Sequence, residues 1–383
     1  MIFITILILF IKLIFSFDLT DSLLKNNLSI EREKRAILRR KIYSWREKEI
    51  IYTVNCKLDE NLIRQALLRI SRETCLIFKL TTNPKKALFT YQPGLFYQTN
   101  LGRRREIPHK IYVPINKGDI GKVMRETLRA LGVDYEHNRY DRDKYIDINW
   151  KNVKKEFLKY FQKNFKGSTN TYGTKYDYRS VMHFSEDEYG ISGRQVIIAK
   201  NEFMQPFMGR SKHLSFYDAK LINEKYCYYP HIFLPLPCQN FGYIHPRIPS
   251  ICKCPSFTQG NDCQGLITNN HFCTFHNRLF ATREKSIVFP RVGGRCTFYI
   301  STSYGKKIGI RIEYHNIPIG VPICKDNQHV EIRYKRDLAI SGILFCPGHS
   351  PQVIVSESNQ MVIQSYFPPM QINLVLDFWR ISN

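Results

Sequence analysis

The spacing of the 11 cysteines constrains this chain of 383 residues more than any other feature of its sequence. In an exported chain most cysteines pair, and an odd number leaves one over. Eight of the cysteines form two groups of four: Cys238, Cys252, Cys254 and Cys263, then Cys273, Cys296, Cys324 and Cys346. The other three are far apart in the N-terminal part: Cys56, Cys75 and Cys227. This distribution predicts one larger domain followed by two small cysteine-rich modules.

The N-terminus indicates export. Residues 1–17 are almost wholly apolar, with Lys12 as the one charged residue. An apolar run this short, followed at once by polar sequence, predicts a cleaved signal peptide, and the alternative is an uncleaved anchor. No second apolar stretch of spanning length follows. We therefore expect a secreted, extracellular protein without a membrane span.

Residues 18–35 are expected to form a pro-segment. They contain the sequon Asn27-Leu28-Ser29, which makes Asn27 a candidate glycosylation site. They end in Arg32-Glu33-Lys34-Arg35, a run that suits cleavage by a secretory convertase. The alternative is a solvated run of charges.

The formal net charge of +24 favours acidic partners. Export argues against nucleic acid, so the expected partners are extracellular proteins or a polyanionic matrix. Two basic clusters support a matrix partner, Arg39-Arg40-Lys41 and Arg103-Arg104-Arg105. Taken singly, each cluster is also compatible with a solvated face.

Hydrophobic periodicity predicts a different organisation in the two halves of the chain. Helical spacing occurs within 57–80, followed there by a short strand, and again in 123–131 and 147–165. From about Ser286 onward, short strand-like runs are separated by Gly, Pro, Asn and Asp. This pattern predicts an all-β sandwich.

Four segments of the N-terminal half follow one another in a characteristic order: Glu73 to Phe78, Tyr140 to Trp150, Tyr176 to Phe184, and Leu214 to Cys227. Together they resemble the astacin family of zinc endopeptidases, in which the third segment forms the methionine turn. The resemblance implies an α+β fold with a metzincin-like protease domain at 36–228. After it, Cys238 to Cys263 resembles an EGF-like module (234–264). Cys273, Cys296 to Ile300, Val330 to Ile332 and Cys346 resemble a CUB domain, an all-β sandwich (273–383).

The zinc-binding histidines of the family are replaced in this chain. Metzincins carry H-E-x-x-H-x-x-G-x-x-H, in which the histidines hold the metal. In the register that the four segments imply, Arg125, Arg129 and Tyr135 stand at the ligand positions, while the general base Glu126 and the turn residue Gly132 are kept. The methionine turn keeps Met182, but Phe184 stands where the family has a tyrosine that reaches the metal.

Arginine stays protonated and offers no lone pair, so it repels a zinc ion. We therefore expect no cofactor and a catalytically inactive pseudoprotease that binds extracellular proteins or matrix. The alternative is an active zinc endopeptidase, through a sequence error or another ligand set that includes His137, two positions beyond the family's third ligand. In a third interpretation, the protease fold is only a scaffold for matrix binding.

The resemblance also implies several structural roles. Glu136 follows the last ligand position, where the family's glutamate bonds the freed mature N-terminus; the alternative is a charged residue that ends a helix. The implied disulfides are Cys75–Cys227, Cys238–Cys252, Cys254–Cys263, Cys273–Cys296 and Cys324–Cys346. Cys56 is then left without a partner.

Helical spacing places Arg125 and Arg129 on one face of their helix. We expect both to form an ionic cluster with Glu126 or another carboxylate, because a buried unpaired charge costs several kcal/mol. The cluster would make the former metal site a cationic pocket for a carboxylate. The alternative is that both side chains point into solvent.

The run Arg32 to Arg35, together with Glu136, predicts processing after Arg35. N-terminal sequencing of the secreted protein should find a chain that begins at Ala36. A secreted chain that begins well before Ala36 would contradict this prediction.

Overall fold

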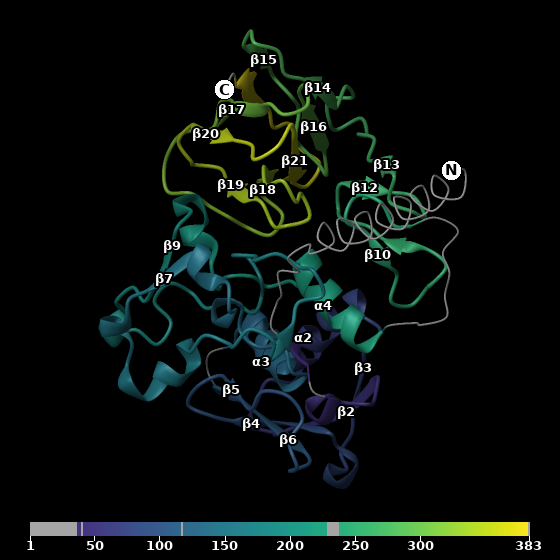
Figure 1. Ribbon diagram of the computed structural model, residues 1–383, viewed down its shortest axis with the longest axis vertical. Helices are drawn as coiled ribbons and strands as arrows, with labels where there is room; N and C mark the ends of the chain where they lie inside the picture. Colours follow the sequence, from purple (N-terminus) through teal and green to yellow (C-terminus); the bar gives the residue numbers. More distant parts are fainter. Residues whose placement is uncertain (1–36, 40, 116–117, 228–236, 382–383) are drawn as a thin grey trace, which may run out of the picture.

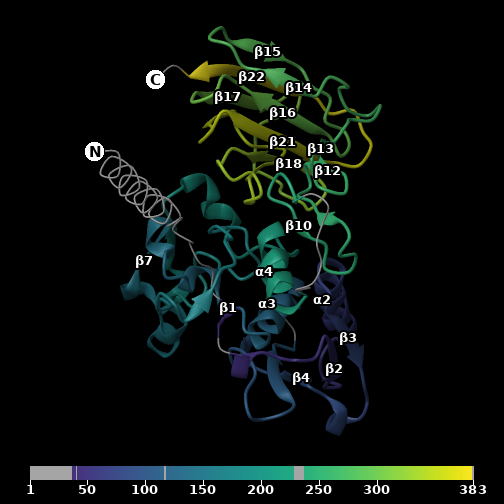
Figure 2. The same cartoon turned by 45° about the vertical axis from the view of Figure 1, so that its right-hand side comes forward.

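Residues 37–39, 41–115, 118–227 and 237–381 are described by the computed structural model of the protein. The predicted signal peptide, the pro-segment with Asn27, and the Arg35–Ala36 junction lie outside these residues. A domain of mixed helix and strand occupies one end of the molecule, and a β-sandwich occupies the other (Figure 1). A small segment with two hairpins lies beside them (Figure 2).

The N-terminal half of the first domain contains a five-stranded sheet in the order β3-β2-β4-β6-β5. Its members are β2 (Glu49–Val54), β3 (Ile77–Leu80), β4 (Phe89–Pro93), β5 (Gln98–Thr99) and β6 (His109–Val113). All neighbours are parallel except β5, which runs antiparallel to β6 at the edge. A further short pair, β1 (Ile37–Leu38) and β8 (Thr169–Asn170), joins the start of the described chain to the second half of the domain.

Two helices of this domain contact each other, α2 (Glu60–Glu73) and α3 (Ile120–Ala130). Aspartate side chains cap both N-termini, Asp59 on the Leu62 amide and Asp119 on the Lys122 amide. After α3 the chain turns at Gly132, whose φ of +92° lies in the left-handed region that favours glycine. The helices expected within 57–80 and 123–131 are thus present.

The second half of the first domain is held mostly by turns and 3-10 helices. Its regular elements are β7 (Ile146–Ile148) paired with β9 (Ile197–Ala199), and α4 (Phe216–Tyr226), which starts with a Ser215–Asp218 capping box. The short 3-10 helices of the chain are Lys41–Tyr43, Pro84–Lys86, Glu136–Asn138, Arg142–Lys144, Trp150–Asn152, Lys155–Phe161, Ile191–Gly193 and Glu202–Phe207.

The helical pattern expected in 147–165 is only partly correct. The segment contains the end of strand β7 and two 3-10 helices, with no α-helix. Phe157 and Tyr160 are both buried and are three residues apart, a spacing that aligns side chains on a 3-10 helix as well as on an α-helix. Hydrophobic spacing over so short a segment does not distinguish a 3-10 helix from an α-helix.

The C-terminal half consists of strands. The small segment has two hairpins, β10 (Tyr243–Ile244) with β11 (Cys252–Lys253) and β12 (Thr258–Gln259) with β13 (Gly265–Leu266). The sandwich has a five-stranded sheet, β14-β16-β21-β18-β19, and a four-stranded sheet, β15-β22-β17-β20. Their strands are β14 (Arg278–Phe280), β15 (Ser286–Val288), β16 (Thr297–Ser301), β17 (Lys307–Tyr314), β18 (His329–Arg333), β19 (Ile343–Phe345), β20 (Gln352–Val355), β21 (Gln360–Tyr366) and β22 (Leu374–Ile381).

These two sheets match the all-β sandwich that the short strand-like runs predict. None of the helices formed by the described residues has the length and apolar character needed to cross a bilayer. The mixed helix and strand content of the first domain confirms the expected α+β class.

Side-chain contacts join the sandwich to the first domain at the segment that holds the methionine turn. Arg179 donates to Glu331 of β18 at 2.8 Å, and Ser341 donates to Asp177 at 2.8 Å. Arg333 also pairs with Glu331, at 3.0 Å. Burial alone would raise the pKa of the Glu331 carboxyl, but Arg333 and Arg179 outweigh it and lower the pKa to about 2.

Glu331→Gln should destabilise the protein at pH 7 by roughly 3 kcal/mol, the linkage value of a carboxyl whose pKa falls from its ordinary 4.5 to about 2 on folding. The stabilisation from a depressed pKa is present above the unfolded pKa and is lost as pH falls through the folded pKa. The difference between variant and wild type should therefore shrink as pH falls from 4.5 toward 2. Urea unfolding at several pH values measures it, with the exposed Glu284→Gln as control.

Candidate functional site

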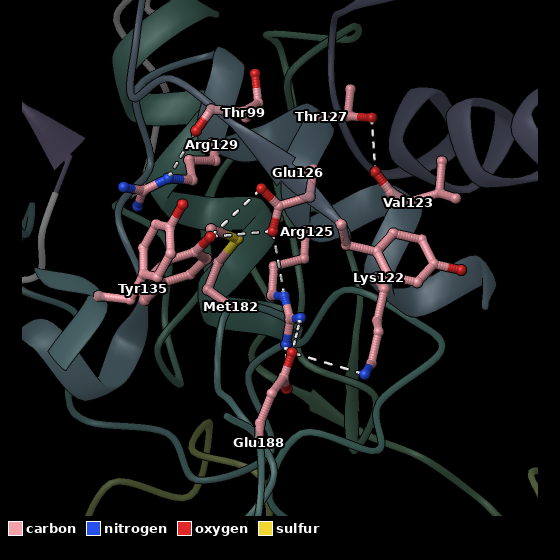
Figure 3. Close-up of polar contacts among 12 residues, drawn as sticks. Thr99, Lys122, Val123, Arg125, Glu126, Thr127, Arg129, Tyr135, Met182 and Glu188 are labelled. Carbon is pink, nitrogen blue, oxygen red and sulfur yellow. Dashed lines mark hydrogen bonds and ion pairs between the residues drawn. The ribbon is translucent and has the colours of Figure 1, made fainter. Parts of the chain in front are cut away.

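Helix α3 carries Arg125 and Arg129, which the resemblance implies stand at two of the family's metal-ligand positions. The side chains of Arg125 and Glu126 are buried, with 2% and 0% exposure, and that of Arg129 is 12% exposed. The turn at Gly132 then brings Tyr135 back against the helix, where its hydroxyl donates to the Glu126 carboxylate at 3.1 Å. Figure 3 shows Tyr135 and both arginines around Glu126.

Arg125 forms the central ion pair of the site. Its two terminal nitrogens donate to the two carboxylate oxygens of Glu188, at 3.0 and 2.5 Å (Figure 3). Its Nε lies 3.5 Å from Glu126, and the guanidinium group lies 4.6 Å from the centre of the Phe184 ring. Burial disfavours the charged guanidinium, but Glu188 and Glu126 outweigh that effect and raise the pKa of Arg125. Arg125 therefore stays charged.

The pKa values of the two carboxylates beside Arg125 are shifted in opposite directions. Burial would raise the pKa of Glu188, yet Arg125 and the ammonium of Lys122, 3.6 Å away, lower it, so Glu188 is ionised. For Glu126 burial prevails and the pKa is raised, despite Arg125 and Arg129. The bidentate geometry thus favours Glu188 as the main counter-ion of Arg125.

Arg129 has its own partners. It forms an ion pair with Asp134 and lies with its guanidinium group 4.1 Å from the centre of the Tyr135 ring. The expected ionic cluster is therefore confirmed for both arginines, but with Glu188 and Asp134 as principal partners. The expectation of a cationic pocket for an external carboxylate is wrong. The protein's own carboxylates already pair with both arginines, and Arg125 is buried.

Tyr135 does not offer the phenolate that a metal would need. Burial, first of all, raises its pKa well above the ordinary value, despite Arg129 beside it. His137, the alternative ligand, is fully buried, and its Nε2 contacts the Tyr160 carbonyl at 3.0 Å. His183 contacts the Tyr176 hydroxyl through Nε2 and the Phe184 carbonyl through Nδ1, both at 2.7 Å. Both histidine rings are thus held by the surrounding chain.

These residues do not fit zinc. Two ligand positions hold paired guanidinium groups, and the third holds a neutral phenol that donates to Glu126. Within residues 37–39, 41–115, 118–227 and 237–381, no group of three His, Cys, Asp or Glu side chains is arranged to hold a metal ion.

The structure places the remaining expected site residues near this cluster. Met182 is buried, and its carbonyl accepts the Glu136 amide at 3.0 Å. Phe184 packs on Tyr135, with ring centres 4.4 Å apart. The Glu136 carboxylate accepts the Asp177 amide at 2.8 Å, and its role toward a freed N-terminus stays a proposal, because Ala36 lies outside the described residues.

The five disulfides of the described residues join the pairs that the resemblance implies: Cys75–Cys227, Cys238–Cys252, Cys254–Cys263, Cys273–Cys296 and Cys324–Cys346. Cys56 is free and exposed. Five disulfides are typical of proteins that fold in an oxidising compartment.

Sequence reasoning missed Glu188 and an aromatic contact across the domain. Glu188 lies in the acidic run Glu186-Asp187-Glu188 directly after the methionine turn, and this run was the one available signal. Phe96, in the loop between β4 and β5, packs on Phe157 with ring centres 5.2 Å apart and lies 6.3 Å from the Tyr189 ring. Phe96 and Phe157 are far apart in the sequence, and no sequence pattern indicated that they would be in contact.

Glu188→Gln should destabilise the protein by about 3–5 kcal/mol, because it leaves the buried Arg125 charge without its main partner. The double variant Arg125→Met/Glu188→Leu removes both charges and should regain most of that loss. Chemical unfolding measures both, with the exposed Glu156→Gln as control. A double variant as unstable as Glu188→Gln would contradict the pairing argument.

Comparison with known proteins identifies the family of the first domain. The sequence profile of the Astacin peptidase family matches residues 37–227. Zinc metalloproteinase nas-34 of Caenorhabditis elegans is 28% identical over 310 residues, which cover 80% of this chain and 50% of that protein. Zinc metalloproteinase nas-23 of the same organism is 29% identical over 362 residues, 90% of this chain and 66% of that protein. The chain thus spans half to two thirds of the length of these relatives.

Among solved structures, the hatching enzyme zinc-protease HCE-1 of Oryzias latipes is 26% identical, with a TM-score of 0.43 over 50% of this chain and 98% of that chain. The profile match covers the domain that contains α3, the methionine turn and the Cys75–Cys227 disulfide. The chain therefore carries a domain of the astacin peptidase family and is a homologue of the zinc metalloproteinases of that family.

Proposed function

We propose that this protein is a secreted pseudoprotease of the astacin family, which binds extracellular proteins or polyanionic matrix and does not hydrolyse peptide bonds. In this proposal residues 36–228 form the protease-like domain, 234–264 an EGF-like module and 273–383 a CUB-like sandwich. The observation that carries the proposal is the ion pair of Arg125 with Glu188 on the helix where the family binds its metal.

The chemistry of that ion pair argues against hydrolysis. A metalloprotease needs a metal that polarises the peptide carbonyl and lowers the pKa of a bound water. A guanidinium group can offset negative charge, but it does not bind water as a Lewis acid and it carries no open coordination position. Glu126, the family's general base, accepts a hydrogen bond from the Tyr135 hydroxyl at 3.1 Å, so its carboxylate is held by the protein's own phenol.

The aromatic contact across the domain supports the same proposal. Phe96 belongs to the sheet half of the domain, whereas Phe157 and Tyr189 belong to the half that follows α3. The Tyr189 hydroxyl also donates to the Tyr97 carbonyl at 3.4 Å. Side chains of the protein's own two halves thus contact each other across the domain.

Surface charge supports binding to a polyanion. The chain segment at Arg39 and the loop with Arg103 to Arg105 lie close together, because the Arg103 amide donates to the Tyr43 carbonyl and Gly102 lies against Leu38. Arg39, Arg104 and Arg105 are exposed. Neighbouring exposed cations attract a polyanion more strongly than separate ones, and salt weakens that attraction.

The purified mature protein should contain no stoichiometric zinc and should not cleave peptides. Glu126→Gln should change no peptidase activity, because no metal-bound water exists for Glu126 to deprotonate. Elemental analysis and a fluorogenic peptide assay with and without chelator measure this, with an active astacin-family protease as positive control. About one zinc per chain together with chelator-sensitive cleavage that Glu126→Gln abolishes would favour the alternative, an active endopeptidase.

A further inference from the structure

A cleft of about 950 Å³ lies where the astacin domain, the small two-hairpin segment and the sandwich meet. The first domain contributes Arg179, Arg210, Lys212 and His213 to its lining, the hairpin segment Lys253, and the sandwich Lys325 and Arg333. The cleft is distinct from the Arg125 cluster, none of whose members line it. Its volume lies in the range of about 300–1,000 Å³ that is typical of ligand sites.

The lining is positively charged. Six arginine and lysine side chains face three carboxylates, Glu73, Asp326 and Glu331, which leaves an excess of three positive charges with neutral histidines. The carboxylates are already used: Glu73 pairs with Lys253, and Glu331 is shared by Arg179 and Arg333. Asp326 lies 3.3 Å from His213.

Three of the six cations have exposed side chains, Arg210, Lys212 and Lys325. In the described part of the chain, none of the three forms an ion pair with a carboxylate. They come from two domains, so their grouping depends on the arrangement of the domains. Cations that lack internal partners are available to an external anion.

The floor of the cleft adds a buried donor without an acceptor. Arg333 is 8% exposed, and its Nε has no hydrogen-bond partner although both terminal nitrogens do. Three half-buried aromatic side chains, Phe207, Phe216 and Tyr366, also line the cleft. Flat apolar rings beside cations suit a ligand that combines pyranose C–H faces with anionic groups.

We propose that this three-domain cleft binds a short stretch of a sulfated polysaccharide chain. The inference rests on the proposed polyanion binding and adds this cleft, as the site for a short chain, to the patch formed by Arg39 and Arg103 to Arg105. Sulfates meet Arg210, Lys212 and Lys325 along the opening of the cleft, and sugar rings lie against its aromatic side chains.

The test measures binding of a heparin-derived hexasaccharide to the full secreted chain by calorimetry. The triple variant Arg210→Ala/Lys212→Ala/Lys325→Ala should weaken binding roughly 30-fold or more, about threefold for each lost charge contact. The variant Arg210→Lys/Lys325→Arg should keep most of the affinity, and a desulfated hexasaccharide should not bind. Thermal unfolding checks that the variants stay folded.

The matched control is Arg103→Ala/Arg104→Ala/Arg105→Ala, which removes three cations outside the cleft. It should leave hexasaccharide affinity within about twofold, because none of these residues lines the cleft. Loss of binding in this control, with the cleft variant unaffected, would overturn the cleft assignment and leave the proposed polyanion binding intact. If neither the hexasaccharide nor long heparin binds, both proposals fail. Tighter binding of poly-glutamate at the same residues would overturn the sulfated class of ligand.

Discussion

The ion pair between Arg125 and Glu188 is the interaction on which the centre of the astacin domain depends. A zinc ion would organise this region by drawing ligands from the helix and from the chain beyond it. Here a covalently attached guanidinium group draws in a carboxylate from beyond the methionine turn, and Phe184 packs on it. The charge is fixed to the helix and cannot be lost to a chelator. A guanidinium group also cannot activate water. Arg125 can therefore replace the structural role of a metal ion but not its catalytic role.

Burial sets the protonation state of the groups beside this ion pair. Glu126 and Tyr135 lie in a buried site where ionisation is costly, so the carboxyl has a raised pKa and the phenol keeps its proton. Arg129 is matched by Asp134 and covered by the Tyr135 ring. A buried cluster of this kind stabilises only as a set, because removing one partner leaves another charge without compensation.

The methionine-turn segment links this centre to the rest of the molecule. Asp177 and Arg179, which precede Met182, contact the sandwich through Ser341 and Glu331. One side of the segment therefore supports the arginine cluster, and the other forms the junction between domains. That junction also groups the cations of the three-domain cleft, so in our proposal the binding site lies where the domains meet, away from helix α3.

The sequence alone determined the helices within 57–80 and 123–131, the position of Arg125 and Arg129 on one face of their helix, and the misfit of arginine with zinc. These features are local, because helical periodicity and the donor inventory of arginine act within a few residues. The α+β class and the turn at Gly132 followed from the resemblance to the astacin family. Tertiary structure alone decided that Glu188, 63 residues away, pairs with Arg125 and that Phe96 reaches Phe157. Such contacts depend on how distant segments of the chain pack together in the folded domain. The spacing of residues along the sequence does not specify that packing.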